Sequence, residues 1–357
     1  MVAIALAASP ADAQSGTARS YEGSAGSTQI VLTLEDEGTD EEAWGRYFYR
    51  STRRDIALQG TRSGDSLTLD ARFTGDRLQL RRQGDTLVGT LTTGAKRRLP
   101  VRLTRVTTAA GVPAEATTDL SLHEKLQLAG LRFEPGATEV IDGKPIRWLS
   151  EAKSGVRLFR LAGGYPAQPM AAMNAALARN QWRDVRHSLA CTSSDGGAGV
   201  IQDVEGKPWL TAEYVSYRVE AAWDCAGAAH PDFGVSGYSF DARSGRELRL
   251  DEVLPAGTQP VPAESSDGWY AYRSEVFAPA VVTLLRRTHA AEMKPVDPEG
   301  EDCNYSDPEV WSFPSWQLTR DGLWLGASFA RVQRVCDNPD WSVIPWSALK
   351  KPAPAAR

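Results

Sequence analysis

Short segments in which apolar and polar residues alternate fill the chain from Tyr21 to Val106, and turns separate them about every 8 to 12 residues. The alternating apolar positions are Ile30, Leu32 and Leu34, Tyr47 and Tyr49, Ile56 and Leu58, Leu67 and Leu69, Leu78 and Leu80, Leu87 and Leu91, and Val101 and Leu103. A period of two buries one face of each strand, and seven or eight such strands without a helix must close upon themselves. We therefore predict an all-β meander domain over residues 19–107, either a small barrel or a sandwich.

A different pattern begins after residues 108–118, which are small, polar and interrupted by proline, as is typical of a linker. Apolar residues at helical spacing predict helices over 168–188 and 274–292. Strands are predicted over 209–223, 237–240, 316–318, 323–331 and 342–344. The sequence therefore predicts that residues 119–350 form an α+β domain, with helices packed on an antiparallel sheet.

Residues 1–13 are interpreted as the remnant of a secretory signal peptide, a short apolar run that ends in Ala11-Asp12-Ala13. We expect the mature chain to begin near Gln14. No later apolar run approaches the roughly 18 residues that a membrane-spanning helix needs. The sequence therefore predicts a periplasmic or secreted protein.

The four cysteines are Cys191, Cys225, Cys303 and Cys336. An exported chain meets an oxidising compartment, so we expect two disulfides. Three connectivities are possible. Pairing Cys191 with Cys225 and Cys303 with Cys336 is favoured because each bond would tie neighbouring segments. A zinc site is not expected, since the sequence has no Cys-x-x-Cys pair and no nearby pair of histidines.

The net charge of −5 is unevenly distributed. Residues 19–107 carry 15 Lys and Arg against 12 Asp and Glu, whereas residues 108–357 carry 25 against 32. An acidic surface repels nucleic acid and attracts basic proteins. We therefore expect no nucleic-acid partner.

Motifs of hydrolytic enzymes are absent from the sequence. It has no Gly-x-Ser-x-Gly nucleophile elbow and no His-Glu-x-x-His zinc motif. The four histidines, His123, His187, His230 and His289, are separated by more than forty residues each. A Ser-His-Asp triad assembled from distant positions remains an enzymatic alternative. No metal and no cofactor are expected.

The segment after Trp223 carries an ordered series of short patterns. They are Ala228-Ala229-His230, then Tyr238-Ser239-Phe240-Asp241 with Gly245 and Leu248, then Leu250-Asp251-Glu252-Val253-Leu254, then Trp316-Gln317-Leu318 with Gly322-Leu323, and finally Val343-Ile344-Pro345. This series resembles an extracellular domain of unknown function, found in the lysozyme-sensing anti-sigma factor RsiV and beside the catalytic domain of the peptidoglycan deacetylase PdaC.

The resemblance covers residues 205–350 and implies a role at the cell envelope, with a lysozyme-like muramidase or peptidoglycan as partner. The chain departs from the pattern at two places. Alanine replaces the paired glycine before His230, and Cys336-Asp337 stands where many members have a glycine-containing loop. The family's ligand contacts are therefore not carried over. His230 itself either caps the turn before Pro231 or contacts a ligand.

Two other features are candidates for partner contact. Two acidic runs are expected in exposed loops, where they are either simply solvated or attract a basic protein. They are Glu35-Asp36-Glu37 with Asp40-Glu41-Glu42, and Asp297, Glu299, Glu301 and Asp302. Trp269, Tyr270 and Tyr272 follow a polar turn, and they either form an exposed aromatic anchor for a protein or glycan or pack in the core.

The leading hypothesis is a non-enzymatic binding protein of the cell envelope, which recognises or inhibits a lysozyme-like muramidase or binds peptidoglycan. A cell-wall hydrolase with an unrecognised site and a structural envelope module are the alternatives.

Overall fold

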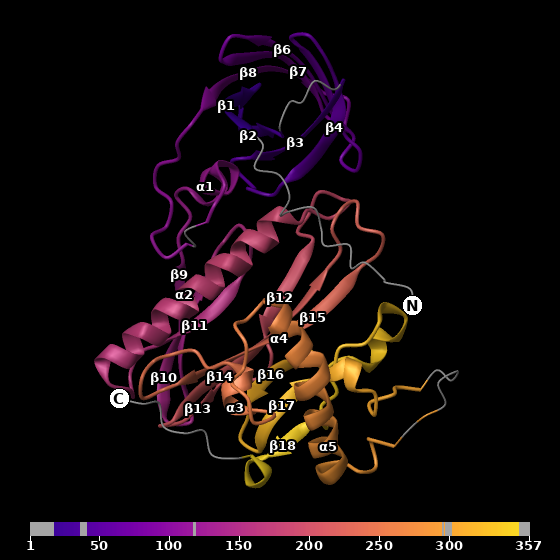
Figure 1. Ribbon diagram of the computed structural model, residues 1–357. Helices are drawn as coiled ribbons and strands as arrows, with labels where there is room; N and C mark the ends of the chain where they lie inside the picture. Colours follow the sequence, from indigo (N-terminus) through magenta and orange to yellow (C-terminus); the bar gives the residue numbers. More distant parts are fainter. Residues whose placement is uncertain (1–17, 36–40, 117–118, 295, 297–301, 350–357) are drawn as a thin grey trace. The chain divides into compact units, whose positions relative to one another are not determined.

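The computed structural model describes residues 18–35, 41–116, 119–294, 296 and 302–349, which fall into two compact units. Among these residues, the first unit holds an eight-stranded antiparallel β-barrel and the second holds three further sheets (Figure 1). The chain is therefore rich in β-structure and has few helices.

The barrel is a continuous meander in which each strand pairs with the next one in the sequence. Its strands are β1 (Arg19–Ala25), β2 (Thr28–Leu34), β3 (Glu42–Tyr49), β4 (Ile56–Ser63), β5 (Ser66–Ala71), β6 (Asp76–Gln83), β7 (Thr86–Thr92) and β8 (Arg98–Val106). Antiparallel pairing of β1 with β8, in which Ser20 faces Val106, closes the ring. Of the two predicted architectures, the structure has the barrel.

Large apolar side chains fill the barrel interior. The buried set comprises Tyr21, Ile30, Leu32, Leu34, Tyr47, Leu58, Leu67, Leu69, Leu78, Leu80, Leu87, Leu91, Val101 and Leu103, together with small alanines. They are the alternating positions of the sequence, because a period of two turns every second side chain inward. Gly64 and Gly84 adopt positive φ values of 56° and 61° in two of the hairpin turns, which suits glycine.

Three further segments belong to the first unit, which comprises Met1–Arg132, Trp182–Val200 and Asp224–Pro231. Helix α1 (Leu122–Leu128) begins at Ser121, whose side chain forms a capping box with Glu124, and its Leu126 packs against Val31 and Phe48. The Cys191–Cys225 disulfide joins the other two segments. The second unit accordingly begins at Phe133, beyond the expected linker.

The second unit contains the remaining strands. They are β9 (Glu134–Ile141), β10 (Lys144–Ser150), β11 (Arg157–Leu161), β12 (Val200–Val204), β13 (Trp209–Leu210), β14 (Tyr214–Trp223), β15 (Asp232–Asp241), β16 (Ser315–Leu318), β17 (Gly322–Gly326) and β18 (Val343–Pro345). The sheets have the orders β11-β10-β9, β12-β14-β13 with β15 also paired to β14, and β16-β17-β18. The single strand expected over 209–223 is therefore two strands, and the one expected over 323–331 ends at Gly326.

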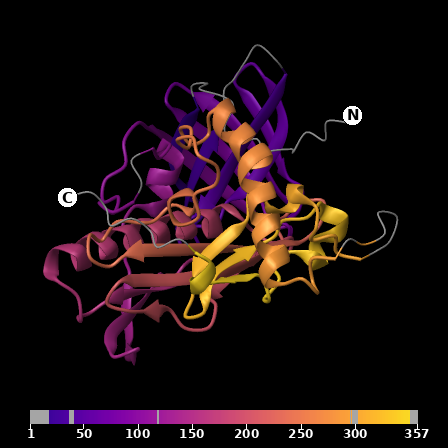
Figure 2. The same cartoon turned by 60° about the horizontal axis from the view of Figure 1, so that its bottom comes forward.

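The helix expected over 168–188 is α2 (Ala167–Ala190), and its Met173 and Leu177 share a core with Trp148 and Phe159. The remaining helical segments are α3 (Leu250–Val253), α4 (Asp267–Tyr272), the π-helical η1 (Arg273–Phe277), α5 (Ala278–Thr288), and the 3-10 turns η2 (Pro308–Trp311), η3 (Arg331–Cys336) and η4 (Trp346–Ala348). Figure 2 shows α4, η1 and α5 as one continuous rod. Residues of η1, α5 and β16 to β18 share the other core of this unit.

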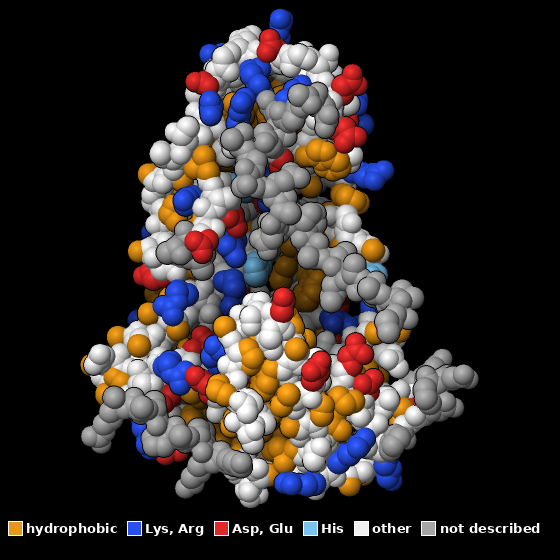
Figure 3. Space-filling view, viewed as in Figure 1, with side chains coloured by type: hydrophobic (Ala, Val, Ile, Leu, Met, Phe, Trp, Pro, Cys, Tyr) orange, Lys and Arg blue, Asp and Glu red, His pale blue; other side chains and the backbone are white. Residues whose placement is uncertain are grey.

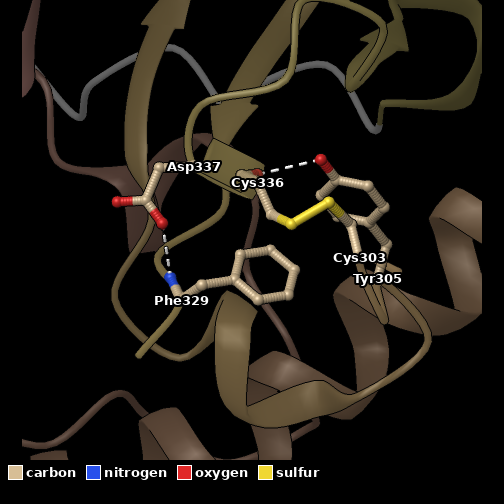
Figure 4. The surroundings of a disulfide bond; sticks show 5 residues. All are labelled: Cys303, Tyr305, Phe329, Cys336 and Asp337. Atoms are coloured by element: carbon tan, nitrogen blue, oxygen red, sulfur yellow. Dashed lines mark hydrogen bonds between the residues drawn. A yellow bond between two sulfur atoms is a disulfide. The ribbon is translucent and has the colours of Figure 1, made fainter. Parts of the chain in front are cut away.

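The second disulfide joins Cys303 to Cys336, so both bonds form with the favoured connectivity. Around it, the Tyr305 hydroxyl donates to the Cys336 carbonyl at 2.9 Å, and the Asp337 carboxylate accepts from the Phe329 amide at 2.6 Å (Figure 4). These bonds fix the loop that follows β17. Two disulfides favour an oxidising, extracytoplasmic environment. Among the described residues, no helix is long and apolar enough to cross a membrane.

Candidate functional site

The predicted aromatic segment forms helix α4, beside a cavity of about 360 Å³ in the second unit. The lining residues are Glu247, Leu248, Arg249, Leu250, Asp251, Glu264, Trp269, Arg273 and Trp316. Helix α4 begins at Ser266, whose hydroxyl accepts from the Trp269 amide at 3.2 Å. This cap sets where the helix starts, and hence where Trp269 lies.

Asp251 is the centre of the polar contacts in this cavity. Its Oδ1 accepts from Nη1 of Arg273 at 2.7 Å, and its Oδ2 accepts from the indole Nε1 of Trp269 at 3.2 Å. Asp251 and Arg273 are both buried. Nε of Arg273 also donates to the Ser312 carbonyl at 2.7 Å. The Trp269 ring is therefore held by a hydrogen bond to a carboxylate that cannot move without breaking a buried ion pair.

The Arg273 guanidinium lies 3.9 Å from the centre of the Phe277 ring, so it is enclosed on an apolar side as well. Burial lowers the pKa of Arg273, and the neighbouring Asp251 carboxylate opposes that shift. Arginine stays protonated in proteins, so the pair remains ionic at neutral pH. Its role is to fix Trp269 rather than to exchange protons.

Trp269, which lines the cavity, contacts two further aromatic rings. The Trp269 ring centre lies 5.2 Å from that of Tyr270 and 5.4 Å from that of Phe313, and the last two are 5.8 Å apart. Tyr270 and Phe313 are 49% and 48% exposed, whereas Trp269 is half-buried. We call these three residues the aromatic cluster. In the space-filling view, hydrophobic side chains gather over the part of the surface where α4 and α5 lie (Figure 3).

Tyr272 does not belong to this cluster, so the expectation of an exposed contact at that position is wrong. Its side chain is only 8% exposed, and its hydroxyl lies 3.4 Å from the Ala256 carbonyl oxygen. The reason is helical geometry, because residues two apart on an α-helix point about 200° from one another. Tyr270 therefore faces solvent while Tyr272 faces the core. Phe313 was not predicted, since a lone phenylalanine 43 positions after Tyr270 gives no local signal.

Of the other candidate contact residues that the structure describes, Asp302 belongs to the second unit and the rest belong to the first. His230 is exposed in the loop between β14 and β15. Glu35 is exposed at the end of β2 and lies 3.6 Å from a guanidinium nitrogen of Arg46. Asp36 and Glu37 lie outside the described residues, as do Asp40, Asp297, Glu299 and Glu301. Glu41 and Asp302 are exposed outside the strands and helices, as expected, whereas Glu42 is exposed at the first position of β3.

A hydroxyl, a histidine and a carboxylate do line up in the first unit. Thr33 Oγ1 lies 2.8 Å from Nδ1 of His123, and Nε2 of His123 lies 2.8 Å from Oδ1 of Asp55. The spacing is that of a nucleophile, a base and an orienting acid. All three side chains are buried, however, and none of them lines the cavity beside α4. This arrangement therefore has the geometry of a structural network and lacks access for a substrate.

Within the part of the chain that the structure describes, no group of three or more His, Cys, Asp or Glu side chains is arranged to hold a metal ion.

Comparisons with known proteins bring no further assignment. A scan against protein-family models gives no match, and a search of curated proteins gives no significant match.

Proposed function

We propose that this chain is a non-enzymatic binding protein of the cell envelope, either periplasmic or secreted, that recognises or inhibits a lysozyme-like muramidase. The observation that carries the proposal is the aromatic cluster, in which Trp269 is fixed by Asp251 and flanked by the exposed Tyr270 and Phe313. Tryptophan, tyrosine and arginine dominate the binding energy of protein interfaces. An anchor that is already held in one rotamer loses little entropy when it binds.

The chemistry of the cavity favours binding over catalysis. A general acid or base needs a carboxyl group that is free to exchange a proton with substrate. Asp251 is already engaged by both Arg273 and Trp269, and Glu264 lies 3.5 Å from the guanidinium of Arg249. Two of the three carboxylates that line the cavity, Asp251 and Glu264, are therefore held in ion pairs.

The class of partner follows from charge and from sequence resemblance. Residues 108–357 carry an excess of acidic side chains, which attracts a basic enzyme and raises its association rate. The resemblance of residues 205–350 to the RsiV-like domain supports the same partner. We also propose that the C-terminal domain expected over residues 119–350 is an α+β domain with helices on an antiparallel sheet. Two disulfides fit a protein that works outside the cytoplasm.

Peptidoglycan itself is the second candidate, and the cavity size favours it. A volume of about 360 Å³ is within the range of small-ligand sites, roughly 300 to 1,000 Å³. A glycan segment would lie against the ring of Trp269 and receive hydrogen bonds from the ion-paired side chains. The alternatives are a cell-wall hydrolase and a structural envelope module, and the experiment must distinguish both of them from a binding protein.

The test is a titration of the oxidised protein with lysozyme-type muramidases and, separately, with soluble peptidoglycan fragments, at low and at high salt. We expect saturable muramidase binding with loss of lysis, weakened at high salt because ions screen the acidic surface. Phe313→Ala should weaken binding. Phe233→Ala, which removes a similarly exposed ring (42%) outside the aromatic cluster, should not.

Each alternative gives a different result in the same experiment. Binding of fragments alone would assign peptidoglycan as the ligand, and turnover of fragments would assign a hydrolase. Absence of saturable binding to both would leave the structural module. Equal effects of Phe313→Ala and Phe233→Ala would remove the aromatic cluster from the proposal.

A further inference from the structure

A second cavity lies entirely within the first unit, at one end of the β-barrel, and has a volume of about 290 Å³. It is lined by Tyr49, Thr52, Arg54, Ile56, Phe73, Thr74, Asp76, Thr192, Ser194, Asp195 and Gly196. Tyr49 ends β3 and Asp76 begins β6, so the cavity opens at the end where odd-numbered strands finish. The mouth of a β-barrel is a common place for a small-ligand site.

A buried carboxylate is fixed at the base of this cavity. Asp76 is 7% exposed, and it accepts hydrogen bonds from the Tyr47 hydroxyl and, at 2.9 Å, from the Gly94 amide. Burial raises the pKa of Tyr47 far above its usual range, so Tyr47 keeps the proton that it donates. A carboxylate has about four acceptor positions, and these two bonds leave some for a ligand. Asp76 is therefore a rigid acceptor.

Two hydroxyl groups in the lining are available to a ligand. The Tyr49 hydroxyl lies 3.4 Å from that of Tyr47, and burial raises the pKa of Tyr49, so it too stays protonated. The Thr74 hydroxyl is buried and has no hydrogen-bond partner among the described residues. A buried hydroxyl without a partner costs about 1 to 3 kcal/mol. That cost is recovered when a polar ligand occupies the cavity.

The lining also includes a second carboxylate, that of the exposed Asp195, and an apolar ring. Asp195 accepts from the Gly197 amide at 2.9 Å and from the Ser193 hydroxyl, which lowers the pKa of this carboxyl group and keeps it ionised. Phe73 is 46% exposed at the entrance. The cavity therefore combines fixed acceptors, hydroxyls and one accessible aromatic ring.

We propose that this cavity binds a neutral polyhydroxylated ligand, a saccharide. An anionic ligand would be repelled by the carboxylates of Asp76 and Asp195, which outnumber Arg54, the only cation among the lining residues. A cationic ligand would be repelled by the guanidinium of Arg54. A sugar ring avoids both conflicts. Its hydroxyls donate to the two carboxylates, and its apolar face lies against Phe73. This site is separate from the aromatic cluster and does not depend on its proposed partner.

The experiment is saturation-transfer NMR on the full oxidised chain with glucose, galactose, mannose, N-acetylglucosamine and di-N-acetylchitobiose, each at millimolar concentration. We expect at least one sugar to bind. Phe73→Ala should weaken that binding about three- to tenfold, as expected for loss of a ring contact, and Thr74→Val should weaken it by a similar factor. Trp44→Ala is the matched control, because Trp44 is equally exposed on the barrel at 46% but lies outside the cavity.

Tighter binding of the disaccharide than of N-acetylglucosamine would identify the end of a glycan chain as the source of the sugar, and equal binding would identify a free monosaccharide. Binding of none of the sugars would overturn the proposal. So would tighter binding of inorganic phosphate or arginine, used as charged probes, or equal losses in Phe73→Ala and Trp44→Ala. Muramidase binding measured on the same variants separates this result from that of the proposed function, since Phe73→Ala leaves the aromatic cluster unchanged.

Discussion

Nε2 of His123 lies 2.8 Å from Oδ1 of Asp55, and both side chains are buried. A carboxylate oxygen only accepts, so the imidazole Nε2 donates in this pair. Asp55 also accepts from the side-chain amide of Gln127 at 2.9 Å. Because His123 and Gln127 belong to α1 and Asp55 precedes β4, these bonds attach the helix to the barrel.

The first prediction concerns the hydroxyl side of this network. Thr33→Val keeps the shape of the side chain but removes the oxygen that lies 2.8 Å from His123 and 2.8 Å from Ser20. We expect the unfolding free energy to fall by about 1 to 3 kcal/mol, since buried polar groups lose their partner. Urea unfolding measures it. Thr61→Val, at an exposed position on β4, should change stability by less than about 0.5 kcal/mol; equal changes in both variants would contradict a structural role for the network.

The second prediction concerns the ion pair that fixes Trp269. Asp251→Ala leaves the Arg273 guanidinium buried without its carboxylate, and the expected loss of stability is about 3 to 5 kcal/mol. Glu213→Ala breaks the exposed pair with Arg243 and should cost at most about 1 kcal/mol. Thermal unfolding of the two variants provides the comparison. A small effect of Asp251→Ala would mean that the pair does not hold η1 and α3 together.

The barrel strands could be predicted because the patterns that specify them, alternating apolar residues and hairpin turns, are local in the sequence. Each strand repeats apolar residues with a period of two, and the hairpin turns that contain Gly64 and Gly84 have glycine where the backbone φ is positive. Whether these strands form a barrel or a sandwich depends on the pairing between β1 and β8, which no local sequence pattern indicates. The structure confirms the favoured disulfide pairing. This pairing could be predicted because each bond spans fewer than 35 residues and so joins neighbouring segments of the chain.

The missed elements lack a periodic signal. Strand β9 (Glu134–Ile141) is exposed at seven of its eight positions, so burial imposes no alternation on its sequence. Helix α1 is seven residues long, too short for its spacing to stand out. In the candidate site, Trp269 and Tyr270 were identifiable as neighbours in sequence. Phe313 and Asp251 join them only through tertiary packing.

The third prediction concerns the Cys303–Cys336 disulfide. Its residues are 33 positions apart, and closing a loop of that length is worth about 3 to 4 kcal/mol in the unfolded state. Replacing both cysteines by serine should lower the unfolding transition measured by tryptophan fluorescence. Nine of the eleven tryptophans belong to the second unit, so this signal reports on the unit that carries the bond. Replacing both Cys191 and Cys225 by serine should lower the unfolding transition measured by tryptophan fluorescence much less.

The last prediction is a pH dependence that Asp337 imposes. Burial raises the pKa of this carboxyl group above its value in the unfolded chain, although the Phe329 amide and the Arg334 guanidinium oppose the shift. On lowering the pH, the folded state therefore takes up the proton first, and the Asp337 contribution to stability rises as pH falls through that pKa.

Asp337→Asn mimics the protonated form at every pH. Relative to its value at neutral pH, the difference in unfolding free energy between variant and wild type should therefore shift in favour of wild type under acidic conditions. Urea unfolding of both proteins across pH 7 to about 4 measures it, because contributions of the other carboxyl groups cancel in the difference. A difference that stays constant, or that shifts in favour of the variant, would mean that Asp337 does not bind its proton more tightly in the folded state.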